Sequence, residues 1–224
     1  MMFALGSMLS AAEPTVEKPF NGTNFDGWKF RTSNNENCWK IGYMTADASA
    51  LEILPAMVNQ IGANWNNANP RKGVDIYTEE KFGDCTVKVE FLITKGSNSG
   101  VYLMGEYEVQ IADSFGKAAD RLGQGDMGAI YSAAAPKINA AAEPGTWQKY
   151  EIEFVAPKFD ASGNKTSNAL FKKILLNGKV VQENVEAQGP TGGGLTMKDA
   201  AAGPLMLQGD HGPIAFRNIE IIVP

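Results

Sequence analysis

Regular alternation of apolar and polar side chains is the feature of this sequence that most limits its fold. In "DCTVKVEFLI" apolar residues occupy every second position from Cys85 to Ile93, with Thr86, Lys88 and Glu90 between them. Successive side chains of a β-strand point to opposite faces, so this pattern predicts a strand that is buried on one face. "TWQKYEIEFVA" repeats the pattern, whereas helical spacing is nearly absent from the chain.

Turn residues divide the chain into many short strands. Asn177-Gly178 lies between two apolar runs and is a strong signal for a hairpin, and Gly105 splits "GVYLMGEYEVQIAD" into two strands. With no internal repeat or linker, this order predicts one all-β domain, a β-sandwich or jelly roll of antiparallel strands. Residues 59–71 and 133–144 are expected to be long loops that border a site. A short helix is expected in "AADRLG".

Composition excludes several classes of partner. The net charge is −5 and no lysine or arginine cluster occurs, so a nucleic acid or an anionic membrane surface is not expected as a partner. No apolar run is long enough to span a bilayer. The apolar, small-residue segment 1–12 is expected to be the remnant of a signal peptide or a disordered N-terminus, followed by a single domain over 13–224. This predicts a periplasmic or secreted protein.

The two cysteines are too few to form a disulfide framework for such a fold. Cys38 and Cys85 could pair in an exported protein, but Cys85 shares the apolar face of its strand and is expected to be a small core residue. No CxxC motif or histidine cluster is present, so a structural zinc site is not expected.

One predicted strand carries a polar face of unusual chemistry. In "GEYEVQIAD", Glu106, Glu108 and Gln110 share the face opposite the apolar residues. Such a row could face plain solvent. However, other strands bring phenol, thioether and carboxamide groups to the corresponding faces, including Tyr131 and Gln208. This contrast favours a groove, and fixed amides beside aromatic rings suit a sugar.

Carboxylate spacing argues against an ordinary retaining glycosidase. Retaining β-glucanases on sandwich folds use an E-x-D-x-x-E pattern. The corresponding segment here has Gln110 in place of the middle Asp, and Asp113 has the opposite parity to Glu108. A double displacement with two carboxylates is therefore poorly supported. No nucleophile elbow or P-loop is present, and "GPTGGG" is expected to be a flexible loop rather than a phosphate cradle.

Motifs spread over nearly the whole chain resemble those of one family. They are "FNGTNFDGW", "GVDIYTEEKFGD", "KGSNSGVYLMGEYEVQIADS", "GAIY", "PGTWQKYEIEFVAPKFD", "LLNGKVVQENVE", "GPTGG" and "GPLMLQGDHGPIAFRNIEI". In this order they resemble the family of 3-keto-disaccharide hydrolases, a domain described as a glycosyl hydrolase. The resemblance implies a concanavalin A-like jelly roll of two curved antiparallel sheets.

The resemblance also implies a chemistry. A sugar with a ketone at its third carbon has an acidic hydrogen on the second carbon, so a base can start β-elimination of the aglycone, and water adds afterwards. The enzyme then needs a base, an acid for the leaving oxygen, and a group that stabilises the enolate. A divalent metal ion could supply the last of these.

The site residues implied by the resemblance follow from its motifs. The chain's only histidine, His211, and Glu108 are the candidates for proton transfer, with the roles of acid and base left open. Within the motifs, Gln110, Tyr131 and Gln208 are the candidates for binding the carbohydrate, and Asp113 is the candidate for a possible metal contact. Asp75 and Asn98 also lie in the motifs and are expected to hold loops. Of the tryptophans, Trp65 in the Asn-rich loop is the candidate stacking platform, whereas Trp28 and Trp147 each open a strand-like segment and are expected in the core. "QGDHG" carries one glycine more than the family's usual "QDHG", which could shift His211 within its loop.

Three functions fit these features. The first is an enzyme that cleaves 3-keto-glycosides. The second is a non-catalytic carbohydrate-binding module on the same fold, and the third is a scaffold domain of a surface complex, since fold alone does not fix function. The combination of Glu108 and His211 favours the enzyme, because a binding module needs only aromatic and amide groups.

Overall fold

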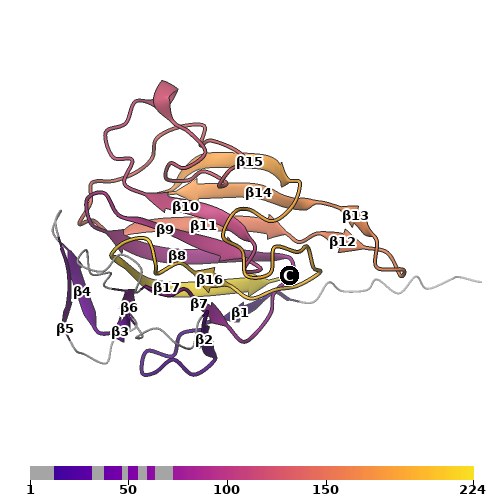
Figure 1. The fold of residues 1–224 in the computed structure, drawn as a ribbon, viewed down its shortest axis with the longest axis horizontal. Helices are drawn as coiled ribbons and strands as arrows, with labels where there is room; N and C mark the ends of the chain where they lie inside the picture. The colour runs from indigo at the N-terminus through magenta and orange to yellow at the C-terminus, as the bar shows by residue number, and fades with distance from the viewer. Residues whose placement is uncertain (1–12, 32–37, 47–49, 55–59, 64–72) are drawn as a thin grey trace, which may run out of the picture.

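The computed structural model describes residues 13–31, 38–46, 50–54, 60–63 and 73–224. Two antiparallel sheets lie face to face in it (Figure 1). The larger, eight-stranded sheet runs in the order β15 (Lys179–Ala187), β14 (Ala169–Leu176), β11 (Gln148–Val155), β8 (Cys85–Ile93), β17 (Ile214–Val223), β6 (Gln60–Ala63) and β3 (Trp39–Ile41), with β1 (Thr15–Glu17) also paired to β17.

The second sheet has five strands and carries the polar face. Its order is β10 (Tyr107–Ala112), β9 (Asn98–Leu103), β16 (Met206–Leu207), β7 (Ile76–Thr78) and β2 (Trp28–Phe30). Two small hairpins complete the strands: β4 (Tyr43–Ala46) with β5 (Leu51–Leu54), and β12 (Lys158–Phe159) with β13 (Lys165–Ser167). Neighbours in both large sheets are often distant in sequence, as expected for the predicted jelly-roll sandwich.

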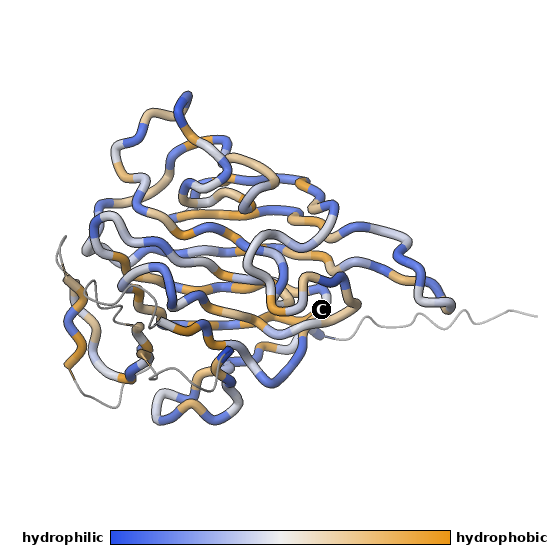
Figure 2. Tube along the Cα trace, in the orientation of Figure 1, coloured by the Kyte–Doolittle hydropathy of each residue, from blue (hydrophilic) through white to orange (hydrophobic). Residues whose placement is uncertain are grey.

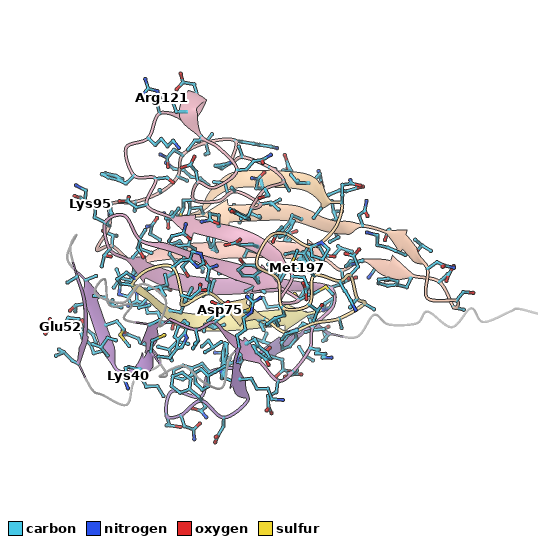
Figure 3. All side chains as sticks on the ribbon, in the orientation of Figure 1. Lys40, Glu52, Asp75, Lys95, Arg121 and Met197 are labelled. Carbon is cyan, nitrogen blue, oxygen red and sulfur yellow. The ribbon has the colours of Figure 1, made fainter. Side chains whose placement is uncertain are left out.

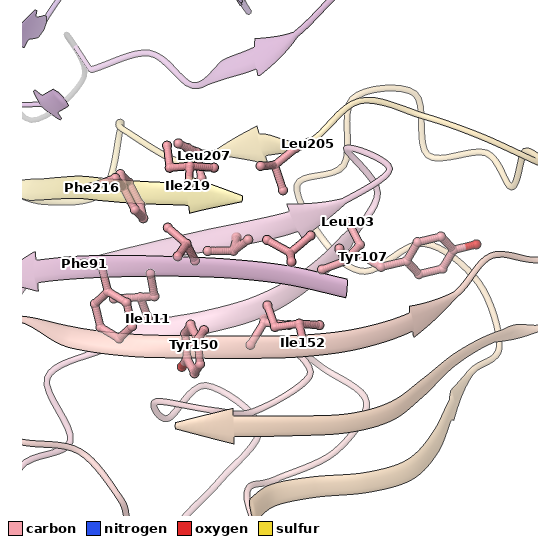
Figure 4. Packing of buried hydrophobic residues seen from close by; sticks show 14 of the residues in the cluster. Phe91, Leu103, Tyr107, Ile111, Tyr150, Ile152, Leu205, Leu207, Phe216 and Ile219 are labelled. Carbon is pink, nitrogen blue, oxygen red and sulfur yellow. The ribbon is translucent and has the colours of Figure 1, made fainter. Parts of the chain in front are cut away.

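The core fills the space between the two sheets (Figure 4). Tyr107 of β10 packs on Phe154 of β11 with ring centres 5.6 Å apart, and the Tyr150 hydroxyl donates a hydrogen bond of 2.6 Å to the Gln110 carbonyl oxygen. The side chains of Tyr107, Val109 and Ile111 are fully buried in this core. Hydropathy alternates along the strands, while the connecting loops are mostly hydrophilic (Figure 2).

Most predicted elements are present. The Asn177-Gly178 turn joins β14 to β15, and both residues have positive φ angles. The β9–β10 hairpin turns at Met104-Gly105, and the short helix is a 3-10 turn over Ala119–Arg121. In the segment 133–144 the only pairing is an isolated bridge at Ala134, so the expectation of a long loop is confirmed there.

The expectation of a loop over 59–71 is wrong at its start. Gln60–Ala63 form β6, which pairs with both β17 and β3, because Ile61 and Ala63 are buried in the core. Residues 64–72, with Trp65, and the segment 1–12 lie outside the described residues.

Of the three residues predicted to lie in the core, two are buried and one is only partly buried. Cys85 and Trp28 are buried in the main cluster, as predicted. Trp147 is only partly buried, and the Arg217 guanidinium lies 4.0 Å from its ring centre. Neither Cys38 nor Cys85 forms a disulfide. No helix within the described part of the chain is long and apolar enough to cross a membrane.

Candidate functional site

A pocket of about 190 Å³ opens on the outer face of the five-stranded sheet, opposite the core. Alternation along β9 and β10 brings polar side chains to this face, as predicted, and the connecting loops supply the rest of the walls. Its lining residues are Asn98, Tyr102, Glu108, Gln110, Tyr131, Gly192, Gly193, Gln208 and His211. Five side chains predicted from sequence therefore meet in one pocket, although they lie on three separate segments of the chain.

Glu108 is buried because its neighbours leave a fitted space for it. Its side chain lies beside Gly100 of the neighbouring strand, where a Cβ atom would come within 2.3 Å of the Glu108 Oε1 atom. Only glycine can therefore occupy this position of β9 while Glu108 keeps its place. The edge of β10 is covered as well: Glu108 N–H donates to Thr191 Oγ1 (2.9 Å), and its carbonyl oxygen accepts from Tyr131 N–H (3.1 Å).

The buried carboxyl of Glu108 has an unusual pKa. Desolvation raises the pKa of Glu108 to about 7, against the opposing effects of a hydrogen bond from Tyr102 and the charge of His211. A carboxyl group with this pKa can both hold and release a proton near neutral pH.

His211 lies in the loop between β16 and β17, held by its neighbour in sequence. Its Nδ1 atom is hydrogen bonded to Asp210 Oδ1, which leaves Nε2 as the ring nitrogen for a ligand. This hydrogen bond raises the pKa of His211 above its usual value despite partial burial, and the charge of Glu108 acts in the same direction. The imidazolium form is therefore favoured in the pocket.

The additional glycine of "QGDHG" has a packing role. A Cβ atom on Gly209 would lie 2.5 Å from the Val74 carbonyl oxygen and 2.7 Å from the Trp39 ring. The backbone of this loop therefore presses directly against residues 73–75 and Trp39. Gly209 N–H also donates to Asp75 Oδ1 at 3.0 Å. Asp75, expected only to hold loops, is 2% exposed and contacts the histidine loop directly.

Two buried carboxamide oxygens at the pocket have no partner among the described residues. They are Gln110 Oε1 and Gln208 Oε1. The corresponding nitrogens are engaged, since Gln110 Nε2 donates to Asn98 Oδ1 (3.2 Å) and Gln208 Nε2 to the Tyr102 hydroxyl (3.4 Å). Buried polar atoms are nearly always paired, so unpaired acceptors in a pocket wall suit a ligand that carries hydroxyl donors.

Tyr131 and the glycine-rich segment form the outer rim of the pocket. Tyr131 is 37% exposed, and a Cβ atom on Gly192 would lie 3.1 Å from its ring. Residues 189–197, here called the strap, run along the turn between β9 and β10: Thr191 N–H and Leu195 N–H donate to the carbonyl oxygens of Glu106 and Gly105. Residues 189–194, predicted to be a loop, contain no helix or strand, and Thr191 Oγ1 accepts a hydrogen bond from Glu108 N–H of β10. In the sequence, the strap was marked by "GPTGG", one of the motifs that resemble the family.

Asp113 lies apart from these residues. It does not line the pocket, and its carboxylate oxygens accept hydrogen bonds from the N–H groups of Gly96 (2.9 Å) and Phe115 (3.3 Å). Within the described ranges, no three His, Cys, Asp or Glu side chains gather into a metal-binding group. Asp113 therefore supports the loop after β10, and the possible divalent metal ion stays a prediction.

Comparison with protein families gives a direct match for nearly the whole described chain. Residues 15–222 match the model of the 3-keto-alpha-glucoside-1,2-lyase-like domain. The chain belongs to this family. No curated protein matches it significantly.

Solved structures agree with the family. A candidate glycosyl hydrolase from Parabacteroides distasonis is 27% identical with a TM-score of 0.62, over 97% of this chain and 94% of that one. A second from the same organism is 16% identical with a TM-score of 0.61, over 93% and 94% of the two chains, and shows the shared fold. The family match and the similarity to these structures together support the conclusion that this chain is a carbohydrate-active enzyme.

Proposed function

We propose that this 3-keto-alpha-glucoside-1,2-lyase-like domain cleaves 3-keto-glycosides by β-elimination, with hydration of the product as a second step. One observation carries the proposal. A carboxyl group with a pKa raised to about 7 and a histidine held toward its protonated form line the same pocket. Such a pair suits proton removal at one carbon and proton delivery to a neighbouring oxygen.

The elimination step assigns one task to each group. The Glu108 carboxylate takes the proton from the second carbon of the sugar, and the electron pair of that bond forms a double bond to the anomeric carbon. The bond from the anomeric carbon to the aglycone oxygen breaks, and its electron pair leaves with the oxygen. The His211 imidazolium donates its Nε2 proton to that oxygen, so the aglycone departs as an alcohol.

The pocket fits this reaction better than hydrolysis by double displacement. A retaining glycosidase needs two carboxyl groups on opposite sides of the bond. Among the lining residues that belong to the described part of the chain, Glu108 is the only carboxylic acid, and Asp113 lies outside the pocket. The ketone of the substrate makes the hydrogen on the second carbon acidic. The aglycone can therefore leave by elimination, without a second carboxylate as nucleophile.

The two pKa shifts predict a bell-shaped dependence of kcat/KM on pH. Activity should rise through about pH 7 as Glu108 loses its proton. It should fall above the raised pKa of His211, as the imidazolium loses its proton. Initial rates in buffers of constant ionic strength measure both limbs. A flat profile between pH 5 and pH 9 would contradict the assignment.

Gln208→Met should weaken sugar binding with little effect on stability, because the hydrogen bond that it removes from the Tyr102 hydroxyl is long, at 3.4 Å. The substitution removes a buried acceptor that has no partner in the free protein, and such an atom costs about 1–3 kcal/mol. Loss of one hydrogen bond to a sugar hydroxyl should raise KM or Kd about tenfold. Gln148→Met is the matched control: Gln148 is a buried glutamine of β11 in the larger sheet, and its Oε1 accepts hydrogen bonds from Ala142 N–H (2.8 Å) and Asn177 Nδ2 (3.1 Å), so this change should lower Tm and leave KM unaltered.

The decisive experiment follows aglycone release from a 3-keto-glucoside, with the unoxidised glucoside as a control. We expect release only from the keto-sugar, together with a product that absorbs as a conjugated enone before water adds. Parallel reactions with a chelator test whether a divalent ion takes part. Binding of the keto-sugar without release would favour the alternative, a carbohydrate-binding module.

A further inference from the structure

Arg31 and Asp75 face each other just beyond the ends of β2 and β7. The ladder between these strands ends at the pair Phe30–Ile76, and Arg31 N–H continues it by donating to the Asp75 carbonyl oxygen at 2.9 Å. Their side chains form an ion pair with 3.0 Å between Nη1 and Oδ2. The Asp75 side chain is 3% exposed and that of Arg31 34%, and Asp75 lies near the middle of the molecule (Figure 3).

Asp75 holds the loop that carries His211. Its Oδ1 atom accepts the hydrogen bond from the N–H group of Gly209, the residue directly before Asp210. Asp210 in turn holds Nδ1 of His211. Desolvation alone would raise the pKa of Asp210, but the hydrogen bond to His211 and the charge of His211 keep it below its usual value. Asp210 therefore stays ionised against the imidazolium.

Arg31 holds the opposite wall of the pocket. Besides its contact with Asp75, Nη1 donates to the Gly193 carbonyl oxygen at 2.7 Å, and Nη2 donates to the Gly194 carbonyl oxygen at 2.8 Å. Gly193 lines the pocket and cannot be replaced easily, because a Cβ atom there would lie 2.7 Å from the Tyr102 hydroxyl oxygen. One guanidinium group thus connects the strap to the histidine loop.

We propose that the Arg31–Asp75 pair is the positioning element of this site, which sets the distance between the His211 loop and the strap. A buried ion pair is a weak source of stability, because desolvation of the charges offsets their attraction. The planar guanidinium, with several donors in a fixed fork, is instead suited to holding three acceptors in one geometry. Reactivity depends steeply on such geometry, so a displacement of about 1 Å can cost about a hundredfold in rate.

The groups that face His211 determine how it should respond. They are Asp210 on its own loop, Asp75 directly before β7, and Glu108 on β10. Cys38 contacts the same loop, since its Sγ donates to the Gly209 carbonyl oxygen at 3.8 Å. Burial raises the pKa of Asp75 and the charge of Asp210 adds to this, while the contact with Arg31 opposes it. Loss of the Arg31 contact should therefore favour neutral Asp75 and lower the pKa of His211.

The test compares Asp75→Asn, Arg31→Lys and wild-type protein by two readouts. Proton NMR of the imidazole ring reports on His211 alone, because it is the only histidine in the chain. Both variants should titrate at lower pH than the wild type. In assays with a 3-keto-glucoside, both should lose about tenfold or more in kcat. Lys29→Met is the matched control, since Lys29 lies on β2 two residues before Arg31 and forms an exposed ion pair with Glu79, at the end of the β2–β7 ladder remote from Asp75.

The two readouts separate this proposal from the proposed function on which it rests. If the wild type releases no aglycone, the proposed function fails, while the histidine titration still tests the positioning role. If Asp75→Asn does not fold, the results for Arg31→Lys decide whether the proposal holds. This substitution keeps the positive charge and removes only the planar arrangement of guanidinium donors. Titration midpoints and kcat values in both variants equal to those of Lys29→Met would overturn the proposal.

Discussion

Glu108→Gln is expected to lower kcat on any 3-keto-glycoside by about 10²- to 10⁴-fold, the usual contribution of a general base. The amide keeps the shape of the side chain and can still accept from the Tyr102 hydroxyl, but it cannot take a proton from carbon. Steady-state rates with a saturating keto-sugar give the effect. The acidic limb of the pH profile should disappear at the same time, because that limb reports the ionisation of Glu108, with its pKa of about 7.

This substitution should also leave the fold intact or stabilise it. The carboxyl group of Glu108 is 3% exposed in the folded chain, and a neutral amide avoids the cost of burying a charge above pH 7. Glu153→Gln serves as the control, since Glu153 forms a partly exposed ion pair with Lys173 on the larger sheet. It should change kcat by less than about twofold, given the small contribution of such pairs. An equal loss of kcat in both variants would remove Glu108 from the mechanism.

Strand parity predicted the polar half of the site. Alternation along "GEYEVQIAD" was enough to assign Glu108 and Gln110 to the face opposite the core, and the same reasoning brought Gln208 to that face. The face to which a side chain points depends only on its position along its own strand, so it can be predicted without knowledge of how the strands pair. It also indicated correctly that Asp113 would not join Glu108, whose carboxylate lies in the pocket.

The supporting residues could not be predicted in this way. The contact between Arg31 and Asp75 depends on the pairing of β2 with β7, and that of Arg31 with the strap joins residues 162 and 163 positions apart. Burial of Glu108 depends on Gly100 and on two loops that cover the edge of β10. Such features arise from register and from loop placement, which alternation does not encode. Gly209 looked like a disturbance of its motif, yet it packs where no side chain fits.

His211→Asn should separate the two steps of bond cleavage when it is tested with two leaving groups. With an alkyl aglycone, the leaving oxygen is strongly basic and needs a proton, so kcat should fall by about 10²- to 10⁴-fold. With a nitrophenyl aglycone, the phenolate leaves without protonation and kcat should remain within about tenfold of the wild type. Release is followed by absorbance for nitrophenol and by chromatography for the alcohol.

Glu108→Gln provides the comparison that gives this result its meaning. Removal of the proton from the second carbon is needed whichever aglycone departs, so Glu108→Gln should be impaired with both. If the pattern is reversed, with Glu108→Gln rescued by nitrophenol and His211→Asn impaired throughout, the imidazole is the base and the buried carboxyl group is the acid. That reversal would also give Asp210 a different task. Its hydrogen bond to Nδ1 would then serve to strengthen a neutral imidazole as a base, instead of holding its proton for the leaving oxygen.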